Sequence, residues 1–253
     1  MNRGTKEGEK YEKDFCIRFN KRDINLNINI LKNTYLEDLY AVQVKHHKFS
    51  LITEKNVKPK SDAFLVNLTK YEFDQCKSEG FYLNEDSLER LKIKYLPRSG
   101  ISIKNLNSKR YQFHKFTYDS FVRTFNNKFL FIGHLIYEKK HLIHKNDDIF
   151  MNLKVSKKTF FENFNSVYEE HDSEDIRYQK IKTFCKNEIC LKINNSKTIQ
   201  NIIFSGEGVF EDPFYASYFF QNDTLMLMTT PANFCVTTGS GRTKGIYTIV
   251  IKP

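Results

Sequence analysis

Residues 58–66 read KPKSDAFLV, and residues 99–104 read SGISIK. Each stretch joins a polar residue to a short run of apolar and β-branched side chains, which is the pattern of a strand covered on both faces. Asp62 opens the first run and Lys104 closes the second. Neighbouring strands of this kind are expected to bring a carboxylate and an ammonium to the same end of one sheet.

The first helix is predicted within residues 5–22. Aromatic side chains recur there at every fourth position and so share one helical face: Tyr11, Phe15 and Phe19. Glu9 and Glu12 lie on an adjacent stripe of that helix. Gly8 is a poor helix former, so the helix is expected to begin near or after it.

Further elements follow the first strand. A helix is predicted over residues 87–95, with Asn84 or Asp86 as its N-cap and Pro97 as its end. Residues 117–137 carry apolar side chains at helical spacing, and residues 111–116 fit either a strand or a loop. From 198 to 252 the chain is strand-like, in the segments IIFSGEGVF, TLMLMTT, NFCVTT and GIYTIVI. The pattern predicts an α/β (α+β) fold, with a central mixed β-sheet flanked by helices and a β-rich C-terminal portion.

Composition limits the class of protein. The chain has 253 residues, of which 40% are hydrophobic and 15% aromatic, so it is expected to fold around a core. Its net charge of +10 favours a polyanionic partner, although a lysine-rich composition without such a partner gives the same value. The five cysteines include no CxxC pair, the N-terminus is charged, and no run of eighteen apolar residues occurs. These features predict a cytoplasmic protein with no membrane partner.

The order of an acidic first helix, an aspartate opening one strand and a lysine ending the next resembles the PD-(D/E)XK nuclease superfamily, in particular type II restriction endonucleases. That family carries an acid on one strand and acid-x-lysine on the next, supported by a glutamate on the first helix. The match here runs from Glu12 through Asp62 to Ser102, Ile103 and Lys104. The resemblance implies a restriction-endonuclease-like core over residues 1–135, followed by a DNA-recognition and sheet-completing portion over 136–253, in one compact unit.

The resemblance also implies roles for single residues. Asp62 and Glu12 are expected to hold Mg²⁺, while Lys104 orients the attacking water. Ser102 stands where the family has Asp or Glu, and the spacing between Asp62 and Lys104 is long. Glu12 is the first candidate to supply the missing carboxylate, and Glu9 the second. The implied activity is sequence-specific, Mg²⁺-dependent hydrolysis of double-stranded DNA by a homodimer.

Basic residues outside this group are candidate DNA contacts. Cations and aromatic groups are interleaved after the catalytic segment, and a glycine-rich loop, GSGRTKG, occupies residues 239–245. The candidates are Lys109, Arg110, Lys115, Arg242 and Lys244. A half-buried hairpin with a wet charged face and an ordinary glycine turn are the competing interpretations. For the whole chain, the alternatives are a metal-independent restriction DNA glycosylase and a non-catalytic basic DNA-binding protein.

Overall fold

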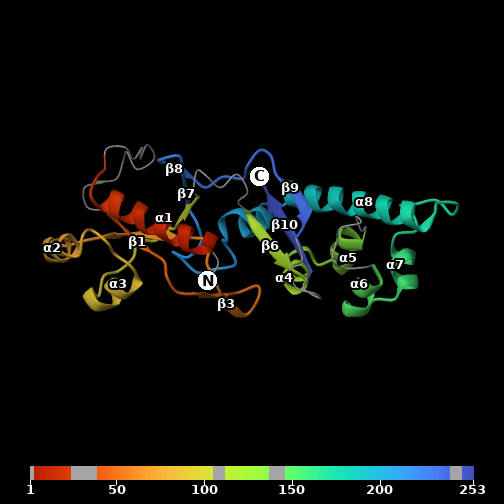
Figure 1. The fold of residues 1–253 in the computed structure, drawn as a ribbon, viewed down its shortest axis with the longest axis horizontal. Coiled ribbons are helices and arrows are strands. Elements are labelled where there is room, and N and C mark those ends of the chain that lie inside the picture. The colour runs from red at the N-terminus through yellow and green to blue at the C-terminus, as the bar shows by residue number, and fades with distance from the viewer. Residues whose placement is uncertain (1–2, 24–38, 105–111, 137–145, 240–246) are drawn as a thin grey trace. The chain divides into compact units, whose positions relative to one another are not determined.

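The computed structural model describes residues 3–23, 39–104, 112–136, 146–239 and 247–253. The chain divides into two units (Figure 1). The first comprises Met1–Lys109 and Phe204–Thr230, and the second comprises Arg110–Ile203 and Pro231–Pro253. Two distant segments therefore build each unit.

The first unit is built on a five-stranded mixed sheet with the strand order β1-β4-β5-β7-β8. The strands are β1 (Leu39–Gln43), β4 (Ala63–Asn67), β5 (Ile101–Ile103), β7 (Tyr218–Gln221) and β8 (Thr224–Leu227). Strand β4 pairs antiparallel with both β1 and β5, whereas β5 and β7 run parallel. A small separate hairpin joins β2 (Lys48–Ser50) to β3 (Lys55–Val57). The predicted mixed sheet flanked by helices is confirmed.

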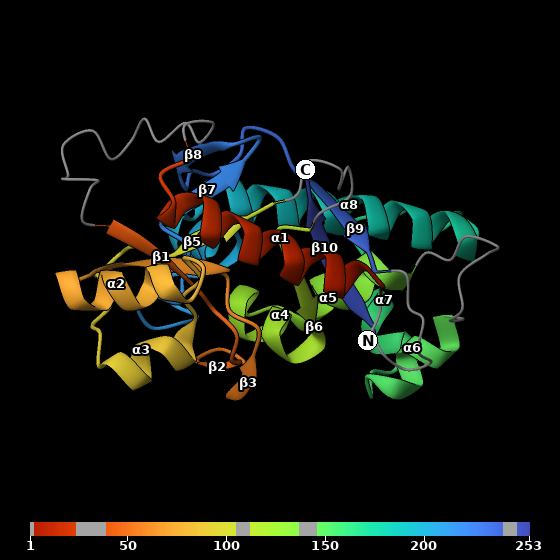
Figure 2. The same ribbon diagram turned by 60° about the vertical axis from the view of Figure 1, so that its left-hand side comes forward.

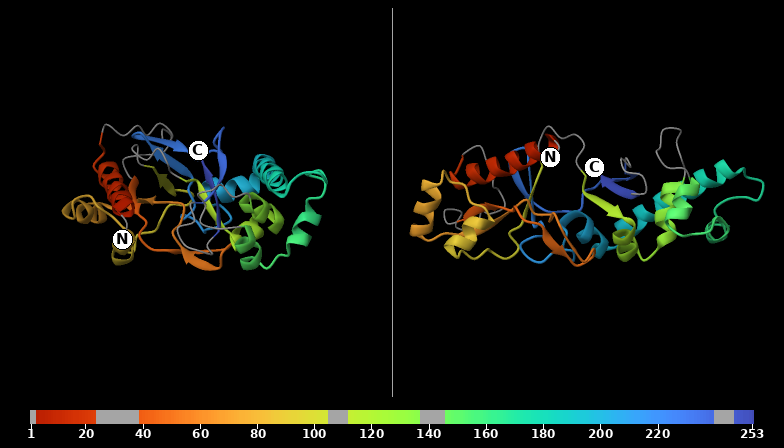
Figure 3. Two further views of the ribbon diagram at one scale, coloured as in Figure 1. Left: turned by 45° about the vertical axis from the view of Figure 1, so that its right-hand side comes forward. Right: turned by 60° about the horizontal axis from the view of Figure 1, so that its bottom comes forward.

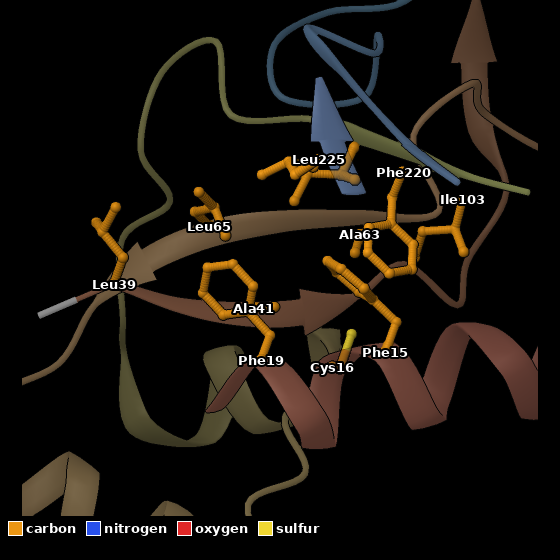
Figure 4. Close-up of a cluster of buried hydrophobic side chains, with 11 residues drawn as sticks. Phe15, Cys16, Phe19, Leu39, Ala41, Ala63, Leu65, Ile103, Phe220 and Leu225 are labelled. Carbon is orange, nitrogen blue, oxygen red and sulfur yellow. The ribbon is translucent and has the colours of Figure 1, made fainter. Parts of the chain in front are cut away.

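Helices cover both faces of this sheet. Side chains alternate between the two faces along a strand, so the apolar strands present buried side chains on each face. Helix α1 (Arg3–Asn20) packs on the face that carries Ala41 and Leu65, with Phe15 and Phe19 buried against the strands (Figure 4). Helices α2 (Lys70–Ser78) and α3 (Glu85–Leu91) belong to the opposite face (Figure 2). The core on that face comprises Tyr40, Val42, Val44, Phe64, Val66, Cys76, Leu83 and Leu88.

Three elements differ from the prediction. Helix α1 runs through Gly8, where an added Cβ would meet nothing within 4 Å, so packing further along the helix outweighs the cost of one glycine. Asn84 caps α3 as predicted, but the helix ends at Leu91, before Pro97, because Lys92 adopts a left-handed conformation. The segment predicted as a strand at 202–210 is instead a π-helix, Asn201–Ser205, followed by a turn at Gly206 with φ of 80°.

The second unit combines a three-stranded antiparallel sheet with helices. The sheet has the order β6-β10-β9, formed by β6 (His114–Thr117), β10 (Thr248–Lys252) and β9 (Cys235–Thr238). The helices are α4 (Tyr118–Phe125), α5 (Lys128–Ile136), α6 (Asn146–Asn152), α7 (Lys157–Asn163), α8 (Glu174–Asn195) and α9 (Lys197–Gln200). The apolar helix α5 packs against the long helix α8, drawn in green and cyan in Figure 3.

The helical spacing predicted over 117–137 corresponds to two helices rather than one. Asn126 ends α4 in a left-handed conformation with φ of 51°. Asparagine tolerates this conformation better than most residues do. Within the described ranges, none of the helices combines the length and the apolar character needed to cross a bilayer.

Candidate active site

Asp62 immediately precedes β4 and is held against β5. Its backbone N–H donates to the carbonyl of Ile101 over 2.8 Å, in register with the Ala63–Ile101 pair. Its carboxylate atom Oδ2 accepts a hydrogen bond of 2.8 Å from the N–H of Ile103 and a long one of 3.5 Å from Ser102 Oγ. The carboxylate is buried, and the neighbouring strand orients it so that Oδ1 faces Lys58.

Lys104 directly follows β5. Its backbone N–H donates to Phe220 on β7 over 2.9 Å, which continues the parallel ladder by one residue. Its side-chain Nζ lies 3.6 Å from Asp62 Oδ2. The predicted meeting of a carboxylate and an ammonium at one end of adjacent strands is thus present in the geometry.

Glu12 reaches the same place from helix α1. Its carboxylate is buried, and it accepts hydrogen bonds from Lys58 Nζ at 2.9 Å and from Gln43 Nε2 at 3.4 Å. Lys58 Nζ also lies 3.6 Å from Asp62 Oδ1, so one ammonium joins the two carboxylates. Burial raises the pKa of Glu12, and the nearby charge of Asp62 raises it further, while Lys58 and Gln43 act in the opposite direction.

Neither Glu9 nor Ser102 places a carboxylate beside Asp62. Glu9 is exposed, and its backbone carbonyl accepts a hydrogen bond of 3.3 Å from Gln43 Nε2. Ser102 is buried beside Asp62 and supplies a hydroxyl in place of a charge. Of the two candidates for the missing carboxylate, Glu12 is the one that lies beside Asp62.

Sequence reasoning missed the residues that link the two carboxylates. Gln43, at the end of β1, holds Glu12 and is itself held by the hydroxyl of Tyr82, which donates to Gln43 Oε1 over 2.6 Å. Lys58 lies in the turn before Asp62, where the sequence pattern does not predict the direction of a side chain. The sequence signal that could have indicated Lys58 was its position four residues before Asp62, in a stretch that contains Pro59.

Lys60 adds a second cation to the Lys58–Asp62 segment. Burial, together with the charge of Lys104, lowers the pKa of Lys60 to about 7, with Asp62 acting in the opposite direction. The stem of Lys60 lies over Gly206, where a Cβ would come within 2.4 Å of Lys60 Cγ. The absence of a side chain at Gly206 therefore leaves room for the stem of Lys60.

The residues present suit a hard divalent cation. Mg²⁺ takes oxygen ligands and is typically held by one or two carboxylates, with water and substrate phosphate completing its shell. Glu12 and Asp62 provide two buried carboxylates, and Lys58 shows that the space between them attracts positive charge. Among the described side chains there is no group of three or more His, Cys, Asp or Glu residues arranged for a metal.

A cavity of about 610 Å³ opens beside Glu12. Its wall is formed by one side of α1, the chain just after β1, and the turn before Asp62. Six of the twelve residues that line it are basic: Lys10, Lys13, Lys45, His46, His47 and Lys58. We call this feature the basic groove. Tyr82 lines it too, with Lys13 Nζ 4.5 Å from the centre of its ring.

Glu85 fixes one edge of the basic groove. This carboxylate, in the first turn of α3, accepts hydrogen bonds of 2.8 Å from the backbone N–H groups of both Lys45 and His46. Lys48 forms an ion pair with the same carboxylate. The side chains of Lys45 and His46 also contact Asp86, so both residues are held at the backbone and at the side chain.

The predicted DNA contacts are only partly within the described chain. Lys115 is exposed on β6 in the second unit. Lys109, Arg110, Arg242 and Lys244 lie outside the described residues.

The sequence was also compared with known proteins. No protein-family model matches this chain, and no curated protein is significantly similar to it.

Proposed function

We propose that this chain is a Mg²⁺-dependent endonuclease that hydrolyses phosphodiester bonds in double-stranded DNA, with the sequence specificity of a type II restriction enzyme. The observation that carries the proposal is the convergence of Glu12, Asp62 and Lys104 at one end of β4 and β5. A mixed sheet flanked by helices and the net charge of +10 are compatible with it.

Each residue has a role that its surroundings support. Glu12 and Asp62 would hold the cation, and the hydrogen bonds from Gln43 and Ile103 fix their directions. Bound there, Mg²⁺ would polarise the phosphate and lower the pKa of a coordinated water. Lys104 Nζ, 3.6 Å from Asp62, would orient the attacking water and stabilise negative charge developing on the phosphate.

The replacement Lys104→Met tests the role of the lysine. Removing one group that stabilises transition-state charge typically lowers the rate by about 10²–10³-fold. We expect a loss of that size in the rate of plasmid cleavage, measured from single-turnover time courses on agarose gels. DNA affinity and the urea midpoint should change little.

Lys94→Met is the matched control, because Lys94 is exposed on the same unit and lines neither the site nor the basic groove. It should cleave at the wild-type rate. Wild-type cleavage by a folded Lys104→Met protein would contradict the assignment.

A further inference from the structure

Lys58 holds the place that a divalent cation would take. Its Nζ lies 2.9 Å from Glu12 Oε1 and 3.6 Å from Asp62 Oδ1, between two carboxylates that would otherwise repel one another. Held between them, the Lys58 ammonium offsets the negative charge of both carboxylates. The two carboxylates are buried, whereas the Lys58 side chain is 57% exposed.

An ammonium and a divalent cation cannot share this space. Mg²⁺ contacts carboxylate oxygens at about 2.1 Å and repels a neighbouring positive charge. Because the Lys58 side chain is 57% exposed, water screens part of its attraction to the two carboxylates, and the side chain can leave without crossing the core. Its flexible stem makes it the movable member of the group.

The basic groove is the place to which Lys58 can move. Lys58 already lines this cavity, together with Lys45 and other cations. Among the described residues that line it, basic side chains outnumber the carboxylates of Glu9 and Glu12, and such a concave surface suits the phosphate backbone of DNA.

We propose that Lys58 is a displaceable counter-ion, which neutralises Glu12 and Asp62 in the metal-free protein and transfers its charge to a DNA phosphate in the basic groove when Mg²⁺ enters. This inference rests on the proposed function. It makes metal binding and DNA binding mutually reinforcing through one side chain, since coupling between two ligands is reciprocal.

The first test is the affinity for Mg²⁺ in the absence of DNA, measured by isothermal titration calorimetry on wild type and on Lys58→Met. Loss of the competing ammonium should tighten Mg²⁺ binding by about fivefold, the size expected for an exposed ion pair. Lys58→Arg keeps the charge and should return the affinity to near the wild-type value. This rescue separates competition from a general structural effect.

The second test is the affinity for a fluorescent DNA duplex, measured by anisotropy with and without Ca²⁺ as the probe ion. Lys58→Met should weaken DNA binding only when the ion is present, because Lys58 otherwise stays on the carboxylates. Lys45→Met is the control: Lys45 lines the same groove but pairs with Asp86, at 3.5 Å. It should leave Mg²⁺ affinity unchanged and weaken DNA binding equally under both conditions.

The outcomes distinguish the inference from the function on which it rests. Equal or weaker Mg²⁺ binding by folded Lys58→Met would overturn the inference and leave the metal site standing. No Mg²⁺ binding by either wild type or Lys58→Met would overturn both. An ion-independent loss of DNA affinity in Lys58→Met would also contradict the transfer of Lys58.

Discussion

Asp62 contacts both the backbone of strand β5 and the charged side chains of the site. One carboxylate oxygen accepts the N–H of Ile103, and the other faces Lys58. The contact with Ile103 gives a buried backbone N–H its hydrogen-bond acceptor, whereas the contact with Lys58 is an attraction between opposite charges. A substitution can therefore separate the two contributions.

We expect Asp62→Asn to abolish Mg²⁺ binding while keeping an acceptor for the Ile103 N–H. Asp62→Ala should abolish binding as well, and it should lower the free energy of unfolding by about 1–3 kcal/mol relative to Asn, because a buried donor then lacks its partner. Calorimetry and urea unfolding measure the two effects. Equal stability of the two variants would argue against the structural contact, and wild-type Mg²⁺ binding by Asp62→Asn would argue against the metal role.

Single residues were predictable from sequence to an uneven degree. Asp62 and Lys104 stand out because each borders an apolar run that must be a buried strand. Glu12 follows from the helical stripe beside the aromatic face of α1. Lys58 and Gln43 could not be assigned, because their directions depend on a turn and a strand end, which periodicity does not describe.

Among the elements, the buried strands and the capped helix α3 were predictable, and the segment 201–210 was not. Its apolar residues resemble a strand, but the positive φ angles of Gly206 and Gly208 turn the chain. Such turns respond to packing, here of the Lys60 stem on Gly206. The local sequence around Gly206 therefore does not predict a contact with Lys60, which lies far away in the chain.

The pair formed by α5 and α8 has its own pH dependence. His134 on α5 is 1% exposed, and burial together with the charges of Lys182 and Lys186 on α8 lowers its pKa to about 3, against a hydrogen bond with the backbone of Thr237. The folded pKa lies below the unfolded value of about 6.5, so the unfolded chain binds the proton first as pH falls. The free energy of unfolding should fall progressively between about pH 6.5 and pH 3.

The matched variant His134→Leu removes this titration. From pH 7 to pH 5 the wild type should lose about 2 kcal/mol more stability than the variant does, at about 1.4 kcal/mol for each pH unit below the unfolded pKa. Urea unfolding followed by circular dichroism at both pH values gives the comparison. Parallel pH profiles for the two proteins would show that His134 does not titrate in this way.

At the scale of the whole molecule, strands β7 and β8 from the C-terminal part of the chain complete the five-stranded sheet that β1, β4 and β5 begin. Strand β7 pairs in parallel with β5 at Ile101 and Tyr218, after the second unit has intervened in sequence. Long-range parallel pairing leaves no local signature. The sequence predicted a mixed sheet flanked by helices, but it could not indicate which distant segment would complete that sheet.

The central claim is that this chain cuts DNA with the help of a divalent ion held by Glu12 and Asp62. The direct measurement is incubation of the purified protein with a mapped plasmid, in Mg²⁺ and in excess EDTA, with the products resolved by size. We predict discrete fragments in Mg²⁺ and intact plasmid in EDTA. Cleavage that persists in EDTA, abasic sites without strand cleavage, or an intact plasmid under both conditions with a folded protein would contradict the account.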